Sequence, residues 1–161
     1  MWQDLIDIII KLTMVYTDIL KSNERKRKAV LAIDMKTLDQ IINEEQKLMA
    51  IVIKEEQKRQ EILKKMADKN PSINLTSNVK SLTFFCPTDY KDKFLAVNKD
   101  LSEIVKKVAD INEANKMLMQ GALTAVNLNL NSLVQMKADP DYKKNGSQYF
   151  SPQEKKLDFK A

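Results

Sequence analysis

The sequence predicts an all-α protein: an elongated antiparallel helical bundle or coiled coil of three long helices, followed by a flexible C-terminal tail. The 161 residues include only two glycines and four prolines, too few for the tight turns that join many short strands. Leu, Ile, Val, Met, Lys, Glu and Gln are frequent and aromatic residues are sparse. Apolar residues also recur at alternating spacings of three and four, which is typical of a coiled-coil seam.

The first helix is expected over residues 2–32. Its apolar stripe has 4-3-4-3 spacing and consists of Leu5, Ile9, Leu12, Tyr16 and Ile19. The stripe continues through two polar residues, Asn23 and Lys26, before it returns to Val30 and Ile33. These polar positions are expected to weaken the packing locally.

The second helix is expected over residues 35–68. Its stripe is Leu38, Ile42, Glu45, Met49, Val52, Glu56, Arg59, Leu63 and Met66. The spacing of five between Ile33 and Leu38 breaks the phase, and Asp34 is suited to cap a new helix. A hairpin turn is the first choice there, and one long bent helix is the alternative. Glu56 and Arg59 form either a buried pair that fixes register or an ordinary surface pair.

A loop and a short helical turn are expected to follow the second helix. Asn70-Pro71 ends that helix, because the residue before proline is pushed out of the helical region. The short turn is expected near residues 78–85, capped by Thr76 or Ser77. Its apolar residues, which would plug one end of the bundle, are Leu82, Phe84 and Phe85.

The third helix is expected over residues 90–137, and its apolar face changes position part-way along. The first stripe is Phe94, Val97, Leu101, Ile104, Val108, Ile111, Asn115 and Leu118. A second stripe, one residue further on, is Met119, Leu123, Val126, Leu130 and Leu133. Gly121 falls where the two stripes meet. The helix is therefore expected to use two different faces.

Helix lengths suggest what the second stripe does. The second helix is about 34 residues long and the third about 48, or ~50 Å against ~70 Å. Packed antiparallel on the second helix, the third would reach the end of its partner near Leu123. The residues from Leu123 to Leu133 would then form an exposed apolar surface, which usually marks an interaction site. The alternative is that the first helix is longer, or bends back, and covers this face.

Residues 1–137 are expected to form one helical domain, and residues 138–161 a flexible tail. The tail is polar and lacks the apolar density needed to offset the entropy of ordering. The densest basic cluster, residues 21–28, indicates either nucleic-acid or membrane contact or a solvated helix end. The second interpretation is favoured, because no recognition motif or aromatic interleaving accompanies the charges.

The composition argues against catalysis. Histidine is absent, and the single cysteine, Cys86, has no visible activating partner and no metal-ligand cluster around it. No phosphate-binding glycine motif is present. Neither an enzyme activity nor a cofactor or metal is expected. The one cysteine fits a reducing cytoplasm. No signal peptide and no membrane-spanning segment are expected.

Three segments, in order, carry a family resemblance: EEQKRQEIL at residues 55–63, INEANKMLMQGAL at residues 111–123, and DYKKNG with Tyr142 four residues before Gly146. Together with the N-terminal Leu/Ile stripe, they are similar to the FlgN-type flagellar export chaperones over nearly the whole chain. The resemblance implies a cytoplasmic helical protein that binds hook-associated proteins before secretion and prevents their premature assembly.

The resemblance also implies two sites. Client binding by terminal amphipathic helices falls on Leu118, Met119, Leu123, Val126, Leu130 and Leu133. Docking to a component of the flagellar export gate falls on Tyr142 and Gly146, although Lys143 stands where members often have glycine. Nucleic acid and membrane insertion are not expected. The rival interpretations are a structural coiled-coil homo-oligomer and an adaptor protein, including a nucleic-acid adaptor, without a role in secretion.

Overall fold

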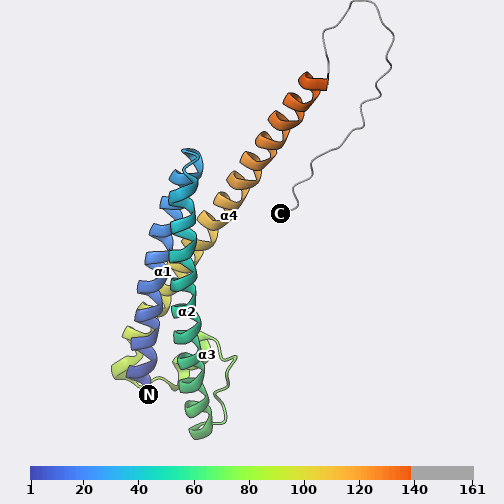
Figure 1. The fold of residues 1–161 in the computed structure, drawn as a ribbon. Helices are drawn as coiled ribbons and strands as arrows, with labels where there is room; N and C mark the ends of the chain where they lie inside the picture. Colours follow the sequence, from blue (N-terminus) through green and yellow to red (C-terminus); the bar gives the residue numbers. More distant parts are fainter. Residues whose placement is uncertain (139–161) are drawn as a thin grey trace, which may run out of the picture. The chain divides into compact units, whose positions relative to one another are not determined.

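The computed structural model describes residues 1–138, and within that range all regular structure is helical (Figure 1). The four helices are α1 (Trp2–Leu31), α2 (Met35–Lys69), α3 (Val79–Phe85) and α4 (Thr88–Ala138). The predicted all-α class is confirmed. The chain divides into two compact units, Met1–Asn115 and Lys116–Ala161, so that α4 contributes to both. Of the predicted tail, Ala138 is the last residue of α4, and the rest, with Tyr142 and Gly146, lies outside the described residues.

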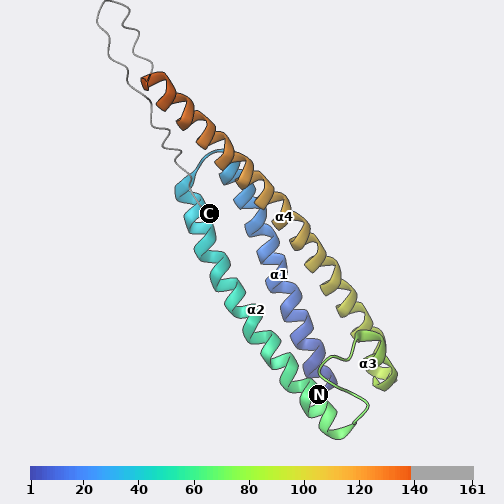
Figure 2. The same ribbon diagram turned by 90° about the vertical axis from the view of Figure 1, so that its right-hand side faces the viewer.

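The α1–α2 connection is a hairpin, not one bent helix (Figure 2). Ion pairs join early α1 to late α2 and late α1 to early α2, as only antiparallel helices allow: Lys11 Nζ lies 2.7 Å from Glu55 Oε1 and Arg25 Nη1 lies 2.6 Å from Glu44 Oε2. Asp34 caps α2 as predicted, since its carboxylate accepts a hydrogen bond of 3.0 Å from the Thr37 backbone N–H.

The first part of α4 runs parallel to α1. At one end of the first unit the rings of Trp2 and Phe94 meet edge to face, with centroids 5.5 Å apart. At the other end Asn115 Nδ2 donates to the Asn23 backbone oxygen at 2.8 Å. Both contacts join residues that are 92 apart in sequence, so the two helices advance in the same direction. In the first unit α4 is therefore antiparallel to α2, as predicted.

Two apolar clusters hold the first unit together. The first gathers side chains from all four helices and the loop before α3: Leu5, Ile6, Ile9, Leu63, Met66, Ile73, Leu82, Cys86 and Phe94. The second joins α1 to α2 and is covered by half-buried residues of α4; its buried members are Leu12, Val15, Ile19 and Val52. The predicted α1 stripe is buried at Leu5, Ile9, Leu12, Ile19, Asn23 and Lys26. Tyr16 and Val30 are half-buried, and Ile33, at the predicted end of the stripe, is 80 % exposed.

The predicted stripe of α2 is wrong by one residue over part of its length. Ile41 and Glu55 are buried, whereas Ile42 is exposed and Glu56 is about one-third exposed. The doublets Ile41–Ile42 and Glu55–Glu56 make neighbouring stripes equally plausible from sequence. The Glu56–Arg59 pair, 2.8 Å from Oε2 to Nε, is consequently the surface pair and not a buried register pair.

The short helix α3 also departs from expectation. Its N-cap is Asn78, whose side chain accepts from the Ser81 backbone N–H at 2.8 Å, and not Thr76 or Ser77. Leu82 is buried as predicted, but Phe84 is 87 % exposed and Phe85 is also exposed. Residues two apart differ in direction by about 200° on a helix, so a helix that buries Leu82 turns Phe84 away from the core.

Candidate partner-binding surface on helix α4

The second unit contains a run of α4 without charge. Residues 117–136 include no Asp, Glu, Lys or Arg, and Lys116 and Lys137 flank the run. No other uncharged run of the chain is longer than ten residues, so a surface helix of this kind is exceptional within it. This run is a sequence signal that periodicity alone did not identify. Solvent-exposed helix faces normally carry charge, so a charge-free one favours contact with another molecule.

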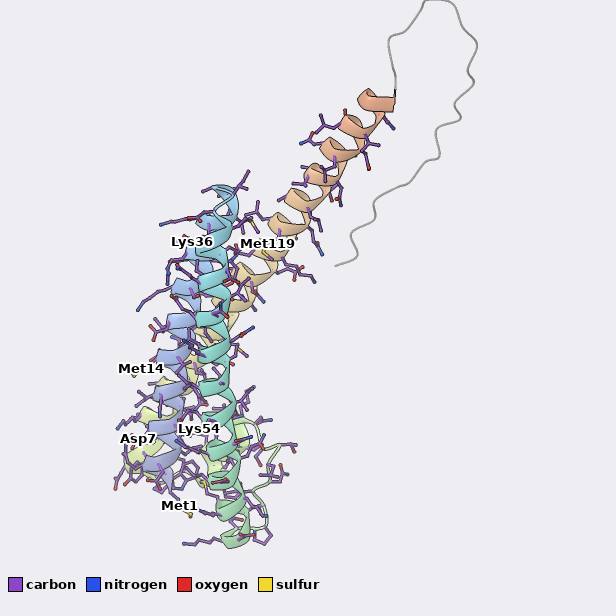
Figure 3. All side chains as sticks on the ribbon, viewed as in Figure 1. Met1, Asp7, Met14, Lys36, Lys54 and Met119 are labelled. Carbon is purple, nitrogen blue, oxygen red and sulfur yellow. The ribbon has the colours of Figure 1, made fainter. Side chains whose placement is uncertain are left out.

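Most of the predicted client-binding residues form a stripe on this run, which we call the α4 stripe. Its members are Met119, Leu123, Val126, Leu130 and Leu133, and they are 39–56 % exposed. At roughly 100° per residue, they fall within an arc of about 80°. Met119 marks the start of the stripe in Figure 3. Leu118 lies about 100° from Met119 around the helix and is half-buried, so it is not part of the stripe.

Sequence periodicity missed three exposed apolar residues near the α4 stripe. Val134 extends the stripe, because it follows Leu130 by four residues on the same face. Met117 and Leu128 are the most exposed of the set and lie on the opposite side of the helix. Their isolation from the 3-4 pattern is the reason that they were not predicted.

Neutral polar side chains border the α4 stripe. Gln120, Thr124, Asn127 and Asn131 follow one flank, and Asn129 and Ser132 follow the other. Amides and hydroxyls can donate and accept hydrogen bonds without fixing the sign of a partner's charge. An apolar centre with a polar rim is the usual arrangement of a protein-binding surface. The stripe is therefore suited to an amphipathic helix laid along it.

A buried polar layer fixes α4 against α1 shortly before the charge-free run begins. Asn115 Nδ2 approaches both the backbone oxygen of Asn23, at 2.8 Å, and its side-chain oxygen, at 3.3 Å. Both asparagines are almost fully buried. The sequence predicted only that Asn23, with Lys26, would weaken the packing of the first helix locally, and it placed Asn115 in the first stripe of the third helix. The structure brings the two together, and a buried asparagine pair of this kind specifies register between helices.

The basic cluster near the end of α1 is largely satisfied within the hairpin. Arg25 pairs with Glu44, and Lys26 pairs with Glu45 of α2. Lys21 Nζ lies 3.3 Å from Asp18 Oδ1 in α1 itself. Because these cations already have carboxylate partners, the arrangement favours the interpretation as a solvated helix end over a nucleic-acid surface.

The described residues offer no metal site, since no three His, Cys, Asp or Glu side chains gather there. Burial raises the pKa of the Cys86 thiol, an effect that the nearby Lys91 charge offsets in part. A raised thiol pKa leaves less thiolate, the reactive form. None of the helices within residues 1–138 is long and apolar enough to cross a membrane.

The described residues thus form an all-α protein with an exposed apolar stripe on a charge-free run of α4. The family model described as FlgN protein matches residues 1–149, and the chain belongs to the FlgN family. That membership gives the protein the role of a flagellar export chaperone, in a family known for chaperones and not for enzymes. Comparison with the curated proteins and with the solved structures gave no match.

Proposed function

We propose that this protein is a cytoplasmic chaperone that binds hook-associated flagellar proteins through the α4 stripe, prevents their premature assembly and delivers them to the export gate. The observation that carries the proposal is the exposure of five apolar side chains on a charge-free helix. Membership of the FlgN family supplies the class of client, because its chaperones bind hook-associated proteins.

The proposed mechanism is masking. The client's terminal amphipathic helix lays its apolar face along the α4 stripe, in the helix-in-groove manner. Each stripe residue keeps roughly half of its area in water, so covering it contributes on the order of 1 kcal/mol. The same client face is then unable to contact its assembly partners. The chaperone and the assembled structure therefore compete for one surface of the client.

The test of the stripe is a pair of double substitutions on the same helix. In Leu123→Asp/Leu130→Asp, two carboxylates would be buried against the client. Desolvation of the two charges is expected to weaken binding of a purified hook-associated protein by about 100-fold or more, measured by calorimetry. The matched control, Leu128→Asp/Gln135→Asp, places equal charge at equal spacing on the opposite side of the helix and is expected to bind normally. Undiminished binding by the first variant, with unchanged helix content, would remove the stripe from the mechanism.

We propose a separate role for Tyr142, which lies with Gly146 outside the described residues. The support is the family pattern of a tyrosine shortly before a glycine, from which this chain departs at Lys143. Tyr142→Ala is expected to bind client normally and to reduce export of that client, measured as secreted protein. Tyr142→Phe separates the hydroxyl from the ring. Normal export by the alanine variant would exclude the tyrosine from docking.

A further inference from the structure

Phe84 is the most exposed large apolar side chain of residues 1–135, at 87 %. It lies in the first unit, on α3, and is not part of the α4 stripe. Single exposed apolar residues are common on proteins, so exposure alone says little. Phe84, however, borders a surface hollow that is lined by apolar side chains and lysines.

The hollow lies between α3 and the start of α4 and has a volume of about 350 Å³. Its lining residues are Lys80, Thr83, Phe84, Lys91 and Leu95. Each helix contributes one lysine and, four residues later, one large apolar side chain: Lys80 and Phe84 from α3, and Lys91 and Leu95 from α4. Because residues four apart share a helix face, each pair forms a wall with an apolar part and a cationic part. We call this hollow the α3–α4 groove.

The charge of the α3–α4 groove is one-sided. No carboxylate lines it, and within residues 1–138 neither Lys80 nor Lys91 has an ion-pair partner. The buried and half-buried cations of the α1–α2 hairpin do have such partners, as Lys26 and Arg59 show. Lysines whose stems lie along apolar surface and whose ammonium groups remain available are complementary to carboxylates.

We propose that the α3–α4 groove binds an acidic amphipathic segment of a partner protein. An apolar side chain of that segment inserts between Phe84 and Leu95, and flanking carboxylates pair with Lys80 and Lys91. A membrane surface fits less well, because lipid-binding segments usually carry a cluster of about four to eight basic residues and this groove has two. The groove provides a second binding surface, on a different part of the chain from the α4 stripe.

The direct test uses three synthetic helical peptides and the full-length protein. The first peptide has a leucine stripe flanked by glutamates, the second replaces the glutamates with lysines, and the third replaces the leucines with alanines. The first is expected to bind saturably and to shift the amide resonances of residues 80–95. Phe84→Ser is expected to weaken it by about tenfold or more. Equal binding of the acidic and basic peptides, or undiminished binding by Phe84→Ser, would overturn the proposal.

A charge-reversal variant distinguishes loss of the binding site from loss of the fold. Lys80→Glu/Lys91→Glu is expected to lose the acidic peptide and to gain the basic one, and a gained affinity cannot arise from an unfolded groove. The matched control, Lys106→Glu/Lys107→Glu on the exposed surface of α4, carries the same change of net charge and is expected to keep the wild-type preference. If Lys80→Glu/Lys91→Glu still preferred the acidic peptide to the basic one, the proposal would be overturned.

Two further measurements separate the α3–α4 groove from the α4 stripe and from a lipid-binding surface. Leu123→Asp/Leu130→Asp is expected to bind the acidic peptide normally, so failure of one surface does not imply failure of the other. Vesicles of phosphatidylserine and phosphatidylcholine test the lipid alternative. Vesicle binding that requires Phe84, with no binding of the acidic peptide, would assign the groove to a membrane instead.

Discussion

Glu55 is the least exposed carboxylate of the described residues, at 2 %. Its Oε1 accepts hydrogen bonds from Lys11 Nζ at 2.7 Å and from Lys58 Nζ at 2.9 Å. These two bonds hold the pKa of Glu55 below its usual value of 4.5, and the bond from Lys11 has the larger effect. Burial acts in the opposite direction. The carboxylate therefore joins α1 to α2 in its charged form.

The lowered pKa sets the sign of a pH dependence. Because the folded pKa lies below the unfolded one, the stabilisation is fully present above about pH 4.5 and is lost as pH falls through the folded pKa. Glu55→Gln is expected to lower the free energy of unfolding by about 1–3 kcal/mol at pH 7. It should also flatten the decline of that free energy below pH 4.5. Urea titrations from pH 7 to about pH 3 measure both effects.

The control for Glu55 is its neighbour Glu56, whose side chain is about one-third exposed and pairs with Arg59 on the surface. Glu56→Gln is expected to change the free energy of unfolding at pH 7 by less than about 1 kcal/mol. If wild type and Glu55→Gln lost stability in parallel on acidification, the buried carboxylate would not be the group responsible.

The turn between α1 and α2 contains a strained residue. Ile33 has φ 55°, in the left-handed region that a β-branched side chain rarely adopts, and its side chain is 80 % exposed. The Ile33 backbone N–H donates to the Val30 oxygen at 3.2 Å, and that of Asp34 to the Ala29 oxygen at 2.9 Å. The end of α1 is thus closed by backbone bonds that need this conformation, at a position where glycine is usual.

Ile33→Gly is expected to raise the free energy of unfolding by about 0.5–1 kcal/mol. Relief of left-handed strain, about 1–2 kcal/mol, exceeds the entropy cost of glycine, about 0.5–1 kcal/mol. Ile33→Ala keeps the strain and is expected to be nearly neutral, since the exposed side chain contributes little packing. Urea titration at pH 7 compares the three proteins. A glycine variant less stable than the alanine variant would show that Ile33 is not strained in this way.

Periodicity predicted the helices well, because each long helix has apolar residues at helical spacing. A recognisable signal also separates each helix from the next. The phase break before Leu38, together with Asp34, located the hairpin; Asn70-Pro71 and Pro87 located the two sides of α3. Where two adjacent residues have similar character, as at Ile41–Ile42, the pattern cannot assign the buried one. Contacts with the other helices determine which of the two residues is buried, and the local sequence does not show those contacts.

The candidate sites were predictable to different degrees, for physical reasons. The α4 stripe follows from spacing, because Leu123, Val126 and Leu130 repeat with the helix period. The Asn23–Asn115 pair joins residues of two helices, so no local pattern shows that one polar residue satisfies the other. The α3–α4 groove likewise requires two helices at once. Its component pairs, Lys80–Phe84 and Lys91–Leu95, are ordinary helix-surface pairs until the fold brings them together.

For the molecule as a whole, a net charge of +5 does not identify a nucleic-acid-binding protein. Arg25 and Lys26, in the densest basic cluster, are paired with carboxylates of α2. A nucleic-acid adaptor would show affinity that falls steeply with salt, since counterion release dominates such binding. Filter binding of DNA and RNA between 50 and 200 mM salt (about the range over which such losses are large) is expected to show only weak retention.

The remaining rival is a structural homo-oligomer that buries the α4 stripe against a second copy. Both hypotheses use the same exposed residues, so they differ only in what covers them. If the stripe binds a client and not a second copy of the chain, the purified protein is expected to show the mass of one chain in light scattering at all concentrations. Leu123→Asp/Leu130→Asp is expected to have the same mass as wild type.

The oligomer hypothesis predicts the opposite on both counts. The wild-type mass would rise with concentration, and the two aspartates would reduce it, because opposed carboxylates in a symmetric contact repel and lose their hydration. The control Leu128→Asp/Gln135→Asp, on the opposite side of the helix, distinguishes this effect from a general influence of added charge. A concentration-dependent mass that only the stripe variant abolishes would mean that a second copy of the chain, and not a hook-associated protein, covers α4.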